Sequence, residues 1–98
     1  MDDRPDHRPS VDLLESTHPF PGTYTIKAIG EAGDDFERRV VDAVTEHLPA
    51  ASDVEHSVRA TRGGRHLAVT LHVTVQNAEQ VRAIYAALHA VDGLTLLL

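Results

Sequence analysis

Residues 54–75, VEHSVRATRGGRHLAVTLHVTV, carry the pattern that decides the fold. Two alternating segments lie on either side of Gly63-Gly64, and a glycine pair suits the positive φ angles of a two-residue turn. The sequence therefore predicts a β-hairpin in which Arg62 faces Arg65.

This turn sets a register that can be checked on the two strands, 54–61 and 65–75. Three apolar pairs share one face of the hairpin: Val54 with Val73, Val58 with Val69, and Ala60 with Leu67. The opposite face pairs Glu55 with His72, Ser57 with Thr70, Arg59 with Ala68, and Thr61 with His66. Because a slip of one residue would mix these faces and bury charges, the register is well specified. The exception is His56, which falls opposite Leu71 on the apolar side.

A further strand and a helix are predicted ahead of the hairpin. The segment TYTIKAIG, residues 23–30, alternates and places three apolar side chains on one face: Tyr24, Ile26 and Ala28. Asp34 and Glu37 then have the spacing of a capping box. Apolar residues follow at every fourth position: Phe36, Val40, Val44 and Leu48. An amphipathic helix that ends at Pro49 is therefore expected.

After the hairpin, Asn77 and Gln80 have the capping-box spacing at the start of a second helix. Its core stripe is Val81, Ile84, Tyr85, Leu88 and Val91. Gly93 ends the helix, and residues 94–98, LTLLL, predict a last strand. The β-α-β-β-α-β order predicts an α+β fold, the ferredoxin-like sandwich, over residues 19–98. This fold has a four-stranded antiparallel sheet in the order 4-1-3-2, with two helices on one face.

Residues 1–18 are expected to form a flexible acidic N-terminal arm. Residues 1–10 are polar and contain prolines. Residues 11–15 predict one helical turn that docks Leu13 and Leu14. The segment after it, 16–22, is expected to be extended, because a residue that precedes proline is pushed out of the helical region.

Composition excludes several classes of function. The chain has 98 residues and no cysteine, which excludes disulfides, zinc-thiolate and iron–sulfur sites, and thiol catalysis. A net charge of −6 repels nucleic-acid backbones unless the cations gather on one face. The chain lacks an apolar run of about 18 residues, and its N-terminus lacks the features of a signal peptide. A cytoplasmic protein with no membrane partner and no cofactor is expected.

No metal site and no catalytic residue are predicted. His66 and His72 share a face of one strand, but at about 3.3 Å per residue they lie too far apart to bind one ion. The serines have no base paired with them that would make one a nucleophile. Lys27 is the only lysine, and it falls on the open face of the first strand. A role toward a partner is therefore expected for it rather than catalysis.

The alternative function is a nucleic-acid- or ribosome-associated protein that uses Arg59, Arg62 and Arg65 on the hairpin. RRM-type proteins stack bases on aromatic side chains of the first and third strands. Here the corresponding open faces carry no Phe, Tyr or Trp. Nucleic acid is therefore a disfavoured partner.

The loop after the first strand is a candidate ligand site, formed by Gly30, Glu31, Gly33 and Asp34. Backbone amides at a helix N-terminus can hold a small carboxylate such as an amino acid. The same glycines also suit a tight connection between a strand and a helix. Both interpretations stay open at this point.

An apolar patch is expected on the open sheet face, formed by Ile29, Ala68 and Leu97 beside an unpaired edge. Self-association would cover both features, so a homodimer is expected. The candidate partner-facing residues are Lys27, Ile29, Arg59, Arg62, Arg65, His72 and Leu97. The leading hypothesis is a non-enzymatic regulatory or binding module that acts through self-association and a small-molecule or protein partner.

Several motifs occur in a recognisable order along the chain. These are LLE ahead of Pro-Phe-Pro, then TIKAIG, VVDAVTEHLP, AEQVRAIYAAL and a final LTLLL. In this order and spacing the chain resembles the YbeD-like family of small bacterial proteins of unknown function. Five residues match the family pattern position by position: Lys27, Gly30, Phe36, Tyr85 and Leu98. The resemblance implies a fold like that of ACT regulatory domains, oligomers and a regulatory role, and it brings no catalytic residue.

Two segments depart from the family pattern. Where the family has a Ser-Ser-Lys-Gly-Asn-Tyr hairpin, this chain has residues 61–66. This segment keeps a cation and a glycine but lacks the serines and the tyrosine. Ala28-Ile29 replaces Val-Met in the family's F-x-x-K-V-M-G motif. If the hairpin tip contacts a partner in the family, the resemblance does not imply that contact for this chain.

Overall fold

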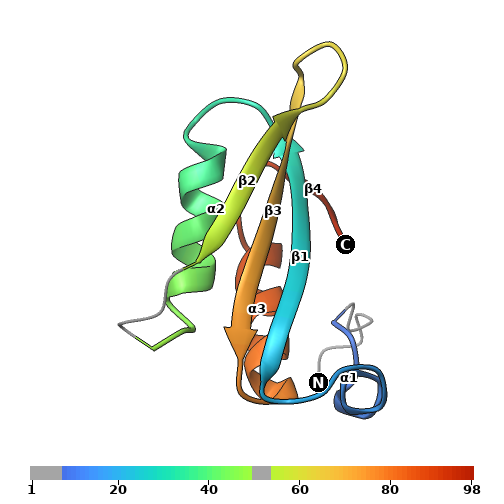
Figure 1. Ribbon diagram of the computed structural model, residues 1–98. Coiled ribbons are helices and arrows are strands. Elements are labelled where there is room, and N and C mark those ends of the chain that lie inside the picture. Colours follow the sequence, from blue (N-terminus) through green and yellow to red (C-terminus); the bar gives the residue numbers. More distant parts are fainter. Residues whose placement is uncertain (1–7, 50–53) are drawn as a thin grey trace, which may run out of the picture.

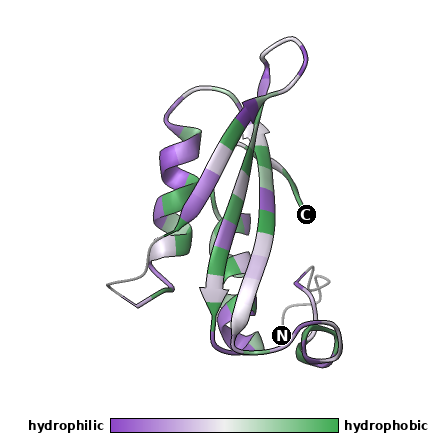
Figure 2. Ribbon diagram, viewed as in Figure 1, coloured by the Kyte–Doolittle hydropathy of each residue, from purple (hydrophilic) through white to green (hydrophobic). Residues whose placement is uncertain are grey.

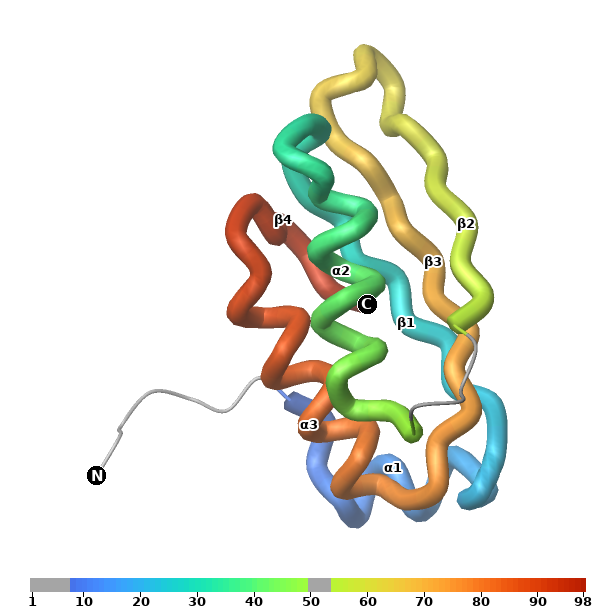
Figure 3. The backbone as a smooth tube through the Cα atoms, turned by 90° about the vertical axis from the view of Figure 1, so that its left-hand side faces the viewer, coloured from blue at the N-terminus to red at the C-terminus, as the bar shows by residue number. Residues whose placement is uncertain are grey.

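The computed structural model describes residues 8–49 and 54–98. The described residues form one four-stranded antiparallel sheet in the order β2-β3-β1-β4, with α2 and α3 on one face (Figures 1 and 3). The elements are α1 (Val11–Thr17), β1 (Gly22–Glu31), α2 (Phe36–Thr45), β2 (Glu55–Ala60), β3 (His66–Val75), α3 (Ala78–His89) and β4 (Leu94–Leu97). The predicted α+β class and strand order are confirmed. The additional helix is α1.

The hairpin register is confirmed, although its turn differs from the prediction. β2 pairs with β3 from Glu55 with His72 to Ala60 with Leu67, as the alternation predicts. The turn has four residues rather than two, because the amide of Thr61 bonds to the oxygen of His66 at 2.9 Å. The turn is longer by one residue on each side of the glycine pair, so the residue pairs within the strands stay as predicted. Arg62 and Arg65 therefore lie in the loop rather than opposite each other in the strands.

The core lies between the sheet and its two helices. Hydrophobic and hydrophilic residues alternate along β1 and β3, as Figure 2 shows, so each strand buries one side. The buried side chains of the sheet are Tyr24, Ile26, Ala28, Val69, Leu71, Val73 and Val75. Those of α2 and α3 that pack on them are Phe36, Val40, Val44, Ala78, Val81, Ile84, Tyr85 and Leu88. The faces predicted for β1 and β3 are therefore confirmed, and so are the helix stripes as far as Val44 and Leu88. Leu48 and Val91 lie beyond the ends of α2 and α3 and are only partly buried, so the first helix ends before the predicted Pro49.

Helix α1 closes one end of this core. Ser10 caps it, since its hydroxyl accepts a 3.1 Å hydrogen bond from the amide of Leu13. Leu14 is buried, whereas Leu13 is 54% exposed, so only one of the two leucines docks. The helix has seven residues and is thus longer than the single turn expected at 11–15. The part of the expected arm at residues 1–7 lies outside the described residues.

The two predicted capping boxes have different outcomes. At α3 the side-chain oxygen of Asn77 accepts from the amide of Gln80 at 2.9 Å, and Gln80 accepts from the amide of Gln76 at 2.7 Å. At α2 the prediction is wrong, because Asp35 is the N-cap residue and makes no side-chain cap hydrogen bond. Asp34 and Asp35 both have positive φ angles, a geometry in which neither side chain bonds to the helix amides.

The register of β4 corrects one predicted position. Leu97 pairs with Ala28, which faces the helices, so Leu97 also lies on the covered face and packs against the core. Leu96 pairs with Ile29 on the open face instead. The prediction for Leu97 fails because a register shift between Ile29 and Gly30 sets the parity of this short strand.

Candidate functional site

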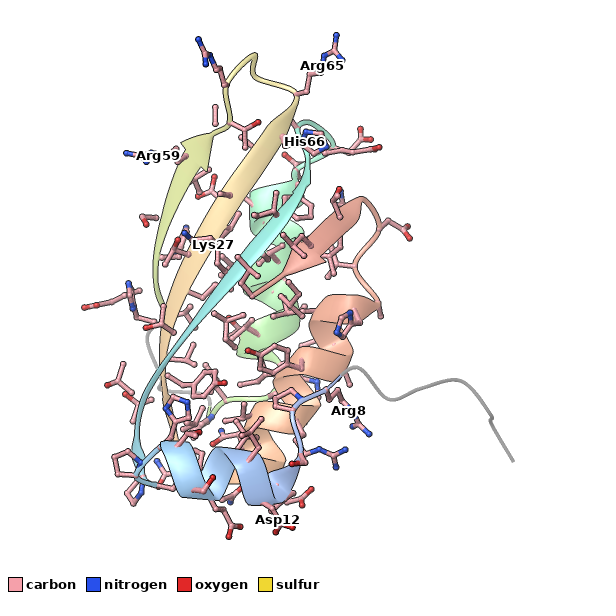
Figure 4. The ribbon with its side chains drawn as sticks, turned by 90° about the vertical axis from the view of Figure 1, so that its right-hand side faces the viewer. Arg8, Asp12, Lys27, Arg59, Arg65 and His66 are labelled. Atoms are coloured by element: carbon pink, nitrogen blue, oxygen red, sulfur yellow. The ribbon has the colours of Figure 1, made fainter. Side chains whose placement is uncertain are left out.

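The face of the sheet that the helices leave uncovered is the main candidate surface. Its strands lie side by side in Figure 4, with Lys27 near the middle. Pairing across β1 and β3 places Thr25 beside His72, Lys27 beside Thr70, and Ile29 beside Ala68. The Thr25 hydroxyl lies 3.0 Å from Nδ1 of His72, which orients that imidazole.

A hollow of about 360 Å³ opens on this face over β3, with β1 on one side and β2 on the other. We call it the cation cleft; it is lined by Lys27, Ser57, Val58, Arg59, Ala68 and Thr70. Within the described part of the chain, neither the Lys27 ammonium nor the Arg59 guanidinium makes a hydrogen bond or an ion pair with another residue. Two of the residues predicted to face a partner are therefore brought together, although they are far apart in sequence.

The apolar part of the open face lies over β1 and β4. Leu96 is 48% exposed and Leu98 is 59% exposed. The amide and oxygen of Leu98 exchange hydrogen bonds of 2.9 and 3.1 Å with the oxygen and amide of Lys27, which extends the pairing of β4 to the last residue. Ile29 lies in the adjacent strand and is only partly exposed. The apolar patch predicted from Ile29, Ala68 and Leu97 therefore has Leu96 and Leu98 in place of Leu97.

The predicted ligand loop has a specific geometry. Gly33, Asp34 and Asp35 all have positive φ angles, so the chain turns left-handed for three residues before α2. The amide of Glu31 already bonds to the oxygen of Gly93 at 3.0 Å. Glu31, Asp34 and Asp35 give this short loop three negative charges, which would repel the negative charge of a carboxylate ligand.

Gly30 lies at a point of close packing. A Cβ at this position would meet the ring of Phe36 and lie 2.6 Å from the oxygen of Gly93. Arg39 adds a second constraint, since its Nε donates to the oxygen of Asp34 at 2.8 Å. The close approach of the Phe36 ring therefore gives Gly30 a packing role in addition to its place in the candidate ligand site.

A second hollow, of about 420 Å³, runs between α2 and the hairpin. Its apolar wall is formed by Phe36, Val41 and Leu67. At its side, Nε2 of His56 lies 2.9 Å from the Glu37 carboxylate. Sequence reasoning placed His56 correctly opposite Leu71 but missed this pairing. No sequence signal joins Glu37 to His56, because the contact depends on how α2 lies against β2.

The hairpin arginines do not form one cluster. Arg65 lies at the hairpin tip and Arg59 lies along β2, as Figure 4 shows. Arg59 lines the cation cleft, whereas Arg62 lies in the loop next to Gly63.

Among the described residues no group of three or more histidine, aspartate or glutamate side chains could hold a metal ion. None of the helices in the described ranges is both long and apolar enough to cross a membrane.

Comparison with known proteins places the chain in a family. The sequence model of DUF493, described as a protein family of unknown function, matches residues 15–98. The chain belongs to the DUF493 family. A UPF0250 protein of Shewanella woodyi is 35% identical over 74 residues, which is 76% of this chain and 82% of that protein. A UPF0250 protein of Azotobacter vinelandii is 37% identical over 67 residues, covering 68% and 73%. The YbeD-like resemblance is thus confirmed.

Solved structures agree on the fold of this DUF493 protein. The ACT domain from GTP pyrophosphokinase of Chlorobium tepidum has a TM-score of 0.63 at 13% identity, covering 78% of this chain and 94% of that domain. The solution structure of protein HP0495 from H. pylori has a TM-score of 0.60 at 15% identity, covering 87% and 92%. At such identities the likeness shows an ACT-like fold and carries no residue roles.

Proposed function

We propose that this DUF493 protein is a non-enzymatic regulatory module of the cytoplasm that acts by self-association and by binding a small-molecule or protein partner. The observation that carries the proposal is the pair of exposed leucines, Leu96 and Leu98, on a sheet face that none of the described helices covers. Exposed apolar side chains grouped in this way favour burial against another surface. The ACT-like fold is compatible with a regulatory module.

A second copy of this chain is the partner that β4 favours. Sheet edges are usually protected by charges, prolines or bulges that prevent pairing with another chain. β4 has the sequence Leu94-Thr95-Leu96-Leu97, which includes no charge and no proline. An antiparallel pair of β4 strands would place leucine against leucine with no charge repulsion.

Sedimentation velocity over a range of protein concentrations tests the proposal. We expect the wild-type chain to form a dimer and the double variant Leu96→Glu, Leu98→Glu to stay monomeric. Leu13→Glu is the matched control, since Leu13 is also an exposed leucine, at 54%, but lies on α1. A wild-type chain that remains monomeric at every concentration would contradict self-association.

The alternative, a nucleic-acid- or ribosome-associated protein, has less support. The net charge is −6, and Arg59 lies along β2 whereas Arg62 and Arg65 lie in the hairpin loop. Salt-dependent retention on RNA that the changes Arg62→Ser and Arg65→Ser abolish would favour it over the regulatory module.

A further inference from the structure

We propose that the cation cleft on the open sheet face is an oxyanion site, which binds a carboxylate or phosphate group carried by a small ligand. The inference deepens the proposed function and rests on it, because it names the chemical class of the small-molecule partner. The proposed ligand site is thus on the open sheet surface, in place of the acidic loop at Gly30–Asp34 that the sequence suggested.

Strand pairing brings the cleft residues into adjacent rows. Lys27 pairs with Thr70, and Thr70 pairs on its other side with Ser57, so these three form one row across β1, β3 and β2. Arg59 pairs with Ala68 in the next row. With strands about 4.8 Å apart and two residues spanning about 6.8 Å, the Cα atoms of Lys27 and Arg59 are about 12 Å apart. Two long cationic side chains can reach one small anion between them over that distance.

The donors in the cleft suit an oxyanion. The ammonium of Lys27 provides a compact charge with three donors, and the guanidinium of Arg59 provides a planar fork that matches a carboxylate or phosphate. The hydroxyls of Ser57 and Thr70 add neutral donors, and the small Ala68 leaves space between the two cations. A carboxylate or phosphate would therefore find two charged donors and two hydroxyls on one surface.

Charge makes this cleft stand out in the molecule. Among residues 8–49 and 54–98, no acidic side chain lines it. The chain as a whole carries −6, and Lys27 is its only lysine. In the part of the chain that the structure describes, both cations of the cleft are without a counter-ion. An anionic ligand would supply the counter-charge for these two exposed side chains.

Proton–nitrogen correlation NMR at pH 7 and constant ionic strength tests the proposal on the full chain. Two probes are titrated in separate arms, inorganic phosphate and succinate, each to about 20 mM, a range suited to millimolar affinity. We expect the amides of Lys27, Ser57, Arg59 and Thr70 to shift together along one saturating curve. Saturation by phosphate alone identifies a phosphate ligand, and saturation by succinate alone identifies a carboxylate ligand. Saturation by both supports the shared oxyanion chemistry.

Charge-matched variants test whether the anion binds at the cleft itself. Lys27→Gln and Arg59→Gln should each weaken binding by about tenfold or more, because each removes a hydrogen bond to a charged group. Arg62→Gln removes the same charge from the hairpin loop, outside the cleft, and should leave affinity within about twofold. Both cleft residues are exposed, so the variants are expected to fold as the wild type does.

Two results would overturn the proposal. One is the absence of a saturating shift with either probe. The other is a shift that centres on Gly33 and Asp34 or that Arg62→Gln weakens as strongly as Lys27→Gln. Sedimentation velocity distinguishes failure of the oxyanion site from failure of self-association. A dimer that binds neither probe removes only the oxyanion site, whereas a monomer that binds phosphate in the cleft removes only self-association.

Discussion

The guanidinium of Arg39 donates a 2.6 Å hydrogen bond to the main-chain oxygen of Asp92, 53 residues along the chain. The same side chain lies over the ring of Phe36, with its central carbon 5.8 Å from the ring centroid. Through its Nε it also bonds to the oxygen of Asp34. One arginine therefore joins the loop before α2, the first turn of that helix and the turn that leads into β4.

Replacing Arg39 should destabilise the domain. We expect Arg39→Ala to lower the free energy of unfolding by about 1–3 kcal/mol, because hydrogen bonds from a charged donor are lost at two carbonyls. Arg39→Lys should recover only part of this, since an ammonium cannot reproduce the planar fork. Urea denaturation measures both. Arg38→Ala is the control, because its ion pair with Asp42 is long, at 3.8 Å, and exposed. Full stability of Arg39→Lys would contradict the bridging role.

Gly30→Ala tests the close packing of the candidate ligand loop. The new methyl would collide with the Phe36 ring and the oxygen of Gly93, so we expect a loss of about 1–3 kcal/mol. Gly33→Ala provides the comparison, since apart from its chain neighbours none of the described residues has an atom within 4 Å of a Cβ there, and its positive φ of 109° is what opposes alanine. That strain costs about 1–2 kcal/mol. Denaturation at a range of urea concentrations measures both. If Gly30→Ala were neutral, the packing role of Gly30 would be wrong.

Leu14→Ala tests whether α1 belongs to the domain. Leu14 is 2% exposed and lies in the core cluster, so its truncation should cost about 2–5 kcal/mol. Leu13→Ala changes the neighbouring leucine, which is 54% exposed, and should stay within about 0.5 kcal/mol. Thermal unfolding followed by circular dichroism compares the two. Equal stabilities would make α1 part of a separate arm, in agreement with a domain that begins near residue 19.

Tyr85 should make stability depend on alkaline pH. Burial raises the pKa of Tyr85 well above its ordinary value of 10.0, and the Tyr24 hydroxyl, 3.5 Å away, adds to this rise. The unfolded chain therefore releases this proton first, so stability is complete below about pH 10 and falls as the pH rises further. Urea midpoints of the wild type and Tyr85→Phe at pH 8 and pH 11 measure the effect. The variant should lose less stability between these pH values, and equal losses would contradict the prediction.

Local patterns predicted most of the sheet and little of the candidate site. Alternation alone paired Val58 with Val69 and put Lys27 on the open face, because the two-residue period of a strand separates its faces. The cation cleft was not predicted, since Lys27 and Arg59 meet only after β3 has been inserted between their strands. Arg39 was not predicted at all, because its acceptors are main-chain oxygens, which leave no mark in the sequence.

By itself the sequence determined the order of the elements, the hairpin register and which side of each long strand is buried. These follow from periodicity and turn residues, which are local properties of the chain. Only the tertiary structure decided the start of α2, where Asp34 and Asp35 take left-handed geometry instead of capping. It also decided that Leu96 and Leu98, rather than Leu97, lie on the open face. A short terminal strand has too few alternating residues to set its own parity, so its pairing with β1 sets it.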